Sequence, residues 1–210
     1  MVFHSVPHIL SQFYFILFGI VKYISVLCNM SQYLLAALDK YNLDKTVDFS
    51  LSMDDFLCQC YALLTPNVYG SRIEDRMIRE LGATSVKPSL ELGDFEYLRK
   101  YFEFKVSFLS RDRSYSITHI RPWQLFNYYL LCFVDCEDNF TAHYYLVDKH
   151  VIHKMKLGYM NGTPKSNRDN HNVEMRKTIK KECLEMNVIK KSNLLEGTSL
   201  DSVKKFMETL

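Results

Sequence analysis

The chain has 210 residues, of which 48% are hydrophobic and 14% aromatic, enough apolar material for one packed domain of moderate size. Seven glycines and five prolines are too few for a linker-rich or disordered protein. The six cysteines lack the paired spacing of zinc knuckles, and no convincing secretory signal stands out. We therefore expect reduced thiols in a cytoplasmic protein.

The net charge of +2 hides an uneven distribution. Residues 149–181 carry nine basic and two acidic side chains, whereas residues 31–60 carry two basic and five acidic ones. A basic segment of this size suits a polyanionic partner, because each Lys or Arg that meets a phosphate releases a condensed counterion. A solvated, lysine-rich helix face has the same composition, so charge alone does not identify the partner.

Residues 9–28 form an apolar run with Lys22 as its only charge, and twenty residues are enough to cross a bilayer. The run lacks a basic segment before it and a small-residue cleavage site after it, which argues against a cleaved signal peptide. It fits a membrane anchor, a helix packed on the domain, or an upstream extension with Met30 as the natural start. We separate residues 1–29 as an apolar extension, for which membrane association is disfavoured but not excluded, from a single domain over residues 30–210.

Helical spacing of apolar residues leads the chain and returns at its end. The first helices are expected over 31–41, over 52–64 with Ser52 as N-cap, and over 71–81 with Ser71 as N-cap and Gly82 past the end. Residues 65–70 read as a turn. Towards the end we expect a short helix at 148–156, a polar loop at 158–170, a basic helix at 171–186 and a last helix at 199–210.

Between these helices lies a block of strand-like segments with period-two alternation. They cover residues 83–95, 101–109, 114–120, 128–136 and 140–147, the last two joined by a turn at 137–139. Helices, then strands, then helices predict an α/β (α+β) protein with a mixed central sheet and helical cover.

The strand at 101–109 carries an unusual polar face. Its even-numbered residues are apolar, whereas Glu103, Lys105 and Ser107 share the opposite face. Asp94 reaches the same face if LGDF is the neighbouring strand of a short hairpin. Two convergent carboxylates suit Mg²⁺, which takes few protein ligands. A lysine beside the ion can orient a water, or help to deprotonate it, for attack on a phosphoryl group. The alternative is an ordinary salt-bridged face on a half-buried strand.

Asp94 followed by Glu103-Phe104-Lys105, with Glu74 in the preceding helix, resembles the PD-(D/E)XK nucleases of the restriction-endonuclease-like fold. The similarity covers roughly residues 69–147 and is greatest to type II restriction endonucleases. It implies that Asp94, Glu103 and Glu74 bind Mg²⁺ and that Lys105 positions the attacking water. Gly93 stands where many members have proline. Ser71 and Glu74 also have capping-box spacing, which would give Glu74 a structural role instead.

The resemblance also suggests that His119, Arg121 and Trp123 lie beside the active-site strand and touch the DNA backbone, or alternatively that this strand end only packs under a helix. Gln124 follows in an expected helix, either lending a polar group to the site or, as we prefer, lying at the surface. The C-terminal third would contact DNA through side chains suited to base edges and phosphates: Lys165, Arg168, Asn170, Arg176, Lys177 and Lys180. An ordinary polar surface loop would look the same.

Together these features predict a Mg²⁺-dependent endonuclease that hydrolyses DNA, of the type II restriction kind, cutting a specific duplex sequence as a homodimer. The alternative is a non-catalytic protein, nucleic-acid-binding or membrane-tethered, in which the acid and lysine face is structural.

Overall fold

The computed structural model describes residues 47–87, 91–159, 174–195 and 199–210. Chain contacts separate residues 1–46, together with Ala62–Leu64, from a second unit of Val47–Tyr61 and Thr65–Leu210. The apolar run at 9–28 and the helix expected at 31–41 lie outside the described residues. Within the described ranges no helix is both long and apolar enough to cross a bilayer.

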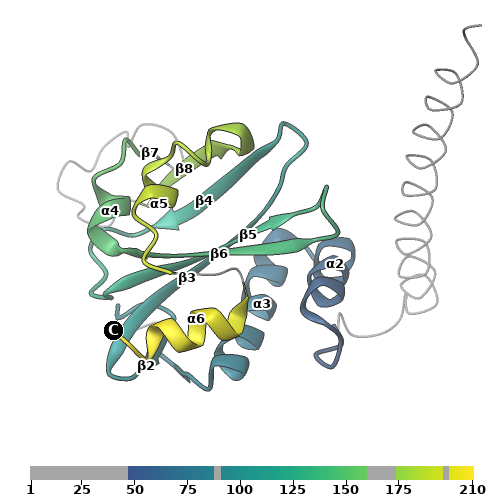
Figure 1. Cartoon of the computed structure of the whole chain (residues 1–210), viewed down its shortest axis with the longest axis horizontal. Helices are drawn as coiled ribbons and strands as arrows, with labels where there is room; N and C mark the ends of the chain where they lie inside the picture. The colour runs from purple at the N-terminus through teal and green to yellow at the C-terminus, as the bar shows by residue number, and fades with distance from the viewer. Residues whose placement is uncertain (1–46, 88–90, 160–173, 196–198) are drawn as a thin grey trace, which may run out of the picture. The chain divides into compact units, whose positions relative to one another are not determined.

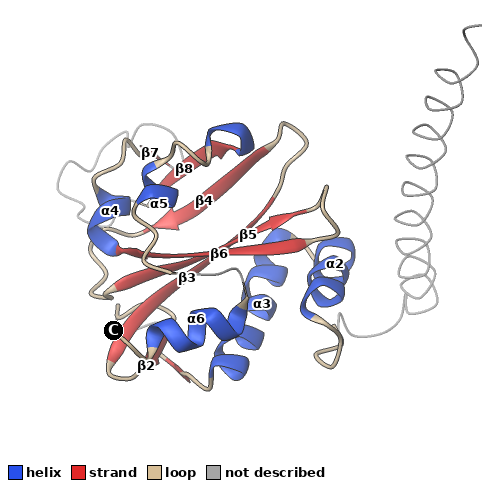
Figure 2. Ribbon diagram, in the orientation of Figure 1, coloured by secondary structure: helices blue, strands red, loops and turns tan. Residues whose placement is uncertain are grey.

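A mixed five-stranded sheet forms the centre of this unit (Figures 1 and 2). Its strands lie in the order β1-β2-β3-β5-β6, with β3 and β5 parallel and every other pair of neighbours antiparallel. Their bounds are β1 Thr84–Ser85, β2 Phe95–Tyr97, β3 Lys100–Phe108, β5 Tyr128–Asp135 and β6 Thr141–Asp148. The expected α+β sheet and the hairpin that brings LGDF beside the next strand are both confirmed.

A second sheet lies over one side of the first and has the order β4-β8-β7, built from β4 Ser114–Ile120, β7 Gly158–Tyr159 and β8 Met175–Lys180. The basic helix predicted over 171–186 is therefore wrong: its described part is β8, followed by the 3₁₀ turn η2 at Lys181–Cys183. The reason is a period of two, since Ile179 is buried while Thr178 and Lys180 are exposed. Pairing with β4 outweighs the helix propensity of the lysines.

The described helices are α2 Met53–Leu63, α3 Pro66–Leu81, α4 Lys149–His153, α5 Val188–Lys191 and α6 Leu200–Met207. In Figure 2, α3 and α6 lie on one side of the central sheet, and the second sheet lies on the other side with α4 and α5. Ser52 caps α2 as expected, because its hydroxyl oxygen accepts from the Asp55 backbone N–H at 3.2 Å.

The start of α3 corrects two expectations. The helix begins at Pro66 after the N-cap residue Thr65, so residues 65–70 are its first turn rather than a separate turn. Proline at the first helical position loses no hydrogen bond, because that N–H would have no helical partner. Ser71 lies inside the helix, and its hydroxyl donates to the Val68 carbonyl at 3.2 Å. The helix does end at Gly82, which is left-handed with φ +69°.

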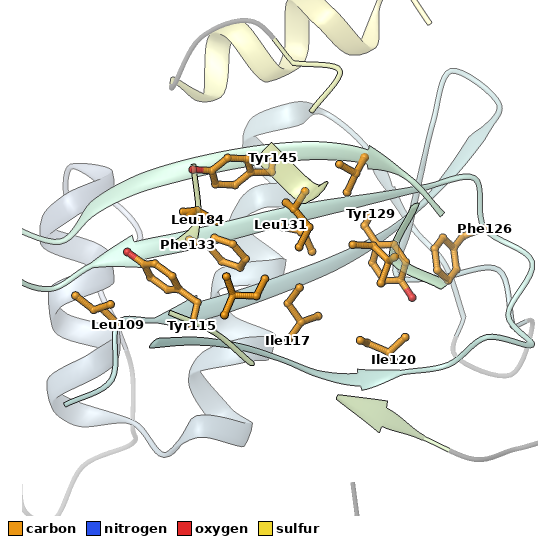
Figure 3. Packing of buried hydrophobic residues seen from close by; sticks show 14 residues of the cluster. Leu109, Tyr115, Ile117, Ile120, Phe126, Tyr129, Leu131, Phe133, Tyr145 and Leu184 are labelled. Atoms are coloured by element: carbon orange, nitrogen blue, oxygen red, sulfur yellow. The ribbon is translucent and has the colours of Figure 1, made fainter. Parts of the chain in front are cut away.

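A core cluster of buried residues fills the space between the two sheets (Figure 3). Tyr129, Leu131 and Phe133 point from β5 towards Ile117 and Tyr115 of β4, and the rings of Tyr115 and Phe133 stack with centroids 4.7 Å apart. Glu103 pairs with Tyr129 and Lys105 with Leu131 in the sheet register. The polar face of β3 therefore lies on the same side of the sheet as this core.

Candidate active site at the edge of β3

A cleft of about 530 Å³ opens along the edge of β3, between the first half of α3 and the end of β4. The paired part of β2 ends opposite Phe102, so the edge of β3 faces the cleft from Phe104 to Phe108. The cleft is lined by Pro66, Tyr69, Gly70, Ser71 and Glu74 of α3, Phe104, Lys105, Val106, Ser107 and Phe108 of β3, Ser116, Thr118 and His119 of β4, and Arg121.

Asp94 is fixed at the edge of β3 by the glycine before it. Gly93 has φ +88°, and a Cβ there would lie 2.6 Å from the Phe102 carbonyl oxygen. This close approach lets the Asp94 N–H donate to that carbonyl at 2.8 Å, while Asp94 Oδ2 accepts from the Phe104 N–H at 2.8 Å. Proline, with φ near −65°, cannot adopt this conformation. The conformation before Asp94 therefore requires glycine rather than proline at position 93.

Glu103 and Lys105 form the centre of the site. Glu103 is 1% exposed, and its Oε1 lies 2.5 Å from Lys105 Nζ as an ion pair. Glu103 Oε2 is buried and has no hydrogen-bond partner among the described residues. Burial raises the pKa of Glu103 although Lys105 opposes it. Burial disfavours the Lys105 cation, yet the negative charges of Glu103 and Asp94 hold the pKa of Lys105 above its ordinary value.

Glu74 faces the pair from α3. Burial, and then the negative charge of Asp94, raise the pKa of Glu74 to about 8, while Lys105 opposes the shift. The capping-box alternative is wrong, because α3 begins at Pro66 and Glu74 lies in its middle. The structure therefore brings together the four residues that the sequence predicted: Glu74, Asp94, Glu103 and Lys105.

These carboxylates fit a magnesium ion of the kind held by few protein ligands. Mg²⁺ is bound by one or two carboxylates and keeps several waters. Asp94 and Glu103 supply such a pair, and the unpartnered, buried Oε2 of Glu103 calls for a cation or a donor. In the described part of the chain no group of three or more His, Cys, Asp and Glu is arranged to hold a metal. The role of Glu74 as a third ligand stays a prediction.

Four residues singled out from the sequence lie at the end of β4 and in the loop that follows it. His119 and Arg121 line the cleft, and both contact Glu174, whose role sequence reasoning missed. One signal was available, since Glu174 is one of only two acids in the basic segment 149–181. Trp123 is half-buried outside the cleft lining. The expectation of a surface Gln124 in a helix is wrong, because Gln124 is 6% exposed in the loop before β5, where packing against neighbouring segments covers it.

Of the predicted DNA-contacting residues, the three that the structure describes, Arg176, Lys177 and Lys180, do not line the cleft. Lys165, Arg168 and Asn170 lie outside the described residues, and Arg176 is exposed on β8. Lys177 Nζ donates to the Lys156 carbonyl at 3.0 Å, and Lys180 Nζ pairs with Asp112 Oδ2 at 3.1 Å. Two of these cations thus have partners within the fold, and their contacts with DNA stay predictions.

Comparison of the chain with protein-family models and with curated protein sequences found no match. The resemblance to PD-(D/E)XK nucleases therefore depends on the residues and on the site geometry alone.

Proposed function

We propose that this protein is a Mg²⁺-dependent endonuclease that hydrolyses phosphodiester bonds of DNA. The observation that carries the proposal is the buried Glu103–Lys105 pair with its unpartnered carboxylate oxygen. Lys105 and Glu74 line the cleft, and the negative charge of Asp94 acts on both. Burial and neighbouring acids raise the pKa values of Glu74 and Glu103, and carboxylates with raised pKa values are typical of functional sites. A structural ion pair needs only one acid and one base.

Each side chain has a definite task in this chemistry. Asp94 and Glu103 would hold Mg²⁺, which neutralises charge growing on the phosphoryl oxygens. Lys105 is protonated at neutral pH, because its pKa lies above the ordinary value, and so it orients the attacking water as a donor rather than removing a proton. Glu74 retains a proton up to about pH 8 while the other acids face it, and it can release that proton when a cation offsets their charge.

The finer parts of the proposal concern the substrate and the assembly. The basic segment 149–181 supports a polyanionic substrate. A type II restriction enzyme would cut both strands of a specific duplex site, and a symmetric homodimer supplies one cleft for each strand. We propose this assembly and a cytoplasmic location together with the activity.

One observation favours the alternative of a non-catalytic binding or membrane-tethered protein. The 2.5 Å contact between Lys105 and Glu103 is also what a purely structural salt bridge would show. In that case the cleft would bind its ligand without changing it.

The test is to incubate the chain with unmethylated plasmid and phage DNA, with Mg²⁺ or with EDTA, beside the variant Lys105→Ala. Lys205→Ala, on the exposed side of α6, removes the same charge away from the cleft and serves as control. We expect discrete fragments that require Mg²⁺ and Lys105 but not Lys205. A smear with the same dependence would leave a nuclease without sequence specificity. DNA left intact by the folded wild-type chain would favour the alternative.

A further inference from the structure

β4 contains an extra residue where it reaches the cleft. Ile117 pairs with Lys177 and Ile120 with Met175, so two residues of β4, Thr118 and His119, lie opposite one residue of β8. His119 adopts a left-handed backbone conformation with φ +50°. Both features define a β-bulge, a distortion that is common beside active sites because it redirects side chains.

The bulge changes which side chains face the cleft. In a regular strand Ile117 and Ile120, three residues apart, would point to opposite faces. Here both are buried in the core between the sheets, at 1% and 0% exposure. The extra residue therefore allows Thr118 and His119 both to line the cleft. The strained backbone at His119 thus has a consequence at the site.

Glu174, immediately before β8, connects the side chains of His119 and Arg121 at this end of β4. Its Oε2 lies 2.7 Å from His119 Nδ1, and its Oε1 accepts from Arg121 Nε at 2.8 Å. Partial burial by itself would raise the pKa of Glu174, but the hydrogen bonds from Arg121 and His119 outweigh it and the pKa lies below its ordinary value. The carboxylate is therefore charged at neutral pH and holds both side chains at once.

The contact with Glu174 occupies only one of the three guanidinium nitrogens of Arg121. Within the described residues its two terminal nitrogens make no recorded hydrogen bond or ion pair, and His119 Nε2 makes none either. Arg121 lines the cleft, and its positive charge partly opposes the upward pKa shifts of Glu103 and Lys105, so its charge is felt at the centre of the site. Donors left over on a fixed guanidinium are suited to a phosphate oxygen.

We propose that Glu174 is a positioning residue that holds Arg121 and His119 as a phosphate-binding pair on the rim of the cleft. The inference rests on the proposed function: the ligand is a backbone phosphate of the nucleic acid next to the one that is cleaved. An unrestrained arginine loses rotamer freedom when it binds. Because Glu174 fixes Arg121 beforehand, the cost of ordering the side chain at the moment of binding is reduced.

The test measures binding of a fluorescein-labelled DNA duplex of mixed sequence by anisotropy, in EDTA so that cleavage does not interfere. We expect Arg121→Ala to weaken binding about tenfold and to reduce the slope of log K against log salt by about one. Arg113→Ala is the matched control, because Arg113 lies at the other end of β4, exposed and paired with Glu137 at 3.3 Å. The control should change the affinity less than about twofold.

Glu174→Gln separates positioning from simple electrostatics, because the two predict opposite signs. Removing an acid beside a phosphate site should tighten binding if only charge matters. We expect instead about threefold weaker binding, because the charge that fixes Arg121 is lost. Glu137→Gln, which removes the acid paired with Arg113, should leave binding unchanged or tighten it slightly. Binding by Glu174→Gln as tight as wild type, or tighter, overturns the inference.

The failure of this inference can be told apart from failure of the proposed function. If wild type cuts DNA but Arg121→Ala and Glu174→Gln bind the duplex as wild type does, the positioning role is wrong and the nuclease stands. If wild type binds with the predicted pattern but does not cut, the positioning role stands and the catalytic proposal fails. If wild type binds no duplex, both are wrong.

Discussion

Two acid–lysine pairs of almost equal length show how differently one kind of contact can be used in this molecule. Glu103 lies 2.5 Å from Lys105 on β3, and Asp135 lies 2.6 Å from Lys181 at the end of β5. Asp135 also accepts from the Glu137 N–H at 3.0 Å, and although burial alone would raise its pKa, these bonds hold the pKa below the ordinary value. The carboxylate of the second pair thus has partners for its oxygens within the fold, as is usual for a structural ion pair.

The first pair differs in what surrounds it. Glu103 has a buried oxygen without a partner among the described residues, and Asp94 adds negative charge that acts on both Glu103 and Glu74. Burial and neighbouring acids raise carboxyl pKa values here, whereas hydrogen bonds lower the one at Asp135. The direction of the pKa shift, rather than the length of the contact, therefore distinguishes a candidate active site from a structural salt bridge.

The largest expected effect comes from neutralising the acid of each pair, Glu103 or Asp135. Glu103→Gln should reduce the rate of DNA cleavage by at least roughly a hundredfold, because a neutral amide is a poor substitute for a metal-binding carboxylate. Asp135→Asn should leave the rate within about twofold and reduce the free energy of unfolding by about 1 kcal/mol. Plasmid nicking rates and urea unfolding of both variants give the answer. Equal losses of cleavage would show that the two pairs do not differ in function.

The next effect concerns the glycine that places Asp94. Gly93→Ala should lower the free energy of unfolding by about 2 kcal/mol or more, because its Cβ would approach the Phe102 carbonyl at 2.6 Å with φ +88°. Gly70→Ala is the matched control, since a Cβ there meets nothing within 4 Å and its place in α3 favours alanine. It should stabilise by up to about 1 kcal/mol. Urea denaturation measures both, and a harmless Gly93→Ala would contradict the close approach.

A smaller effect, visible only in its pH dependence, comes from Glu74. Its folded-state pKa of about 8 lies above the ordinary glutamate value of 4.5, so the unfolded chain ionises first as the pH rises. The stability of the protonated form is fully present below pH 4.5 and is lost as the pH rises towards 8. In EDTA, Glu74→Gln should therefore be more stable than wild type at pH 8 by on the order of 1–2 kcal/mol, and equal to it at pH 4.5. Parallel pH curves for the two proteins would refute the shift.

Much of the fold, and the centre of the site, could be predicted from local patterns. Alternation identified β3, β5 and β6, and a short hairpin was the condition under which Asp94 would reach the face of Glu103 and Lys105. The strand β8 could not be identified, because Lys and Arg favour a helix and only pairing with β4 decides otherwise. Glu174 was missed for the same reason, since its contacts with His119 and Arg121 cross 55 and 53 residues of chain.

The most direct measurement of the central claim is the rate at which the chain nicks supercoiled plasmid as the Mg²⁺ concentration is raised from zero. The account predicts no nicking in EDTA and a rate that rises with Mg²⁺ to a plateau, with Glu103→Gln inactive throughout. Nicking that is independent of Mg²⁺, nicking by Glu103→Gln at the wild-type rate, or plasmid left intact by the folded wild-type chain would contradict it.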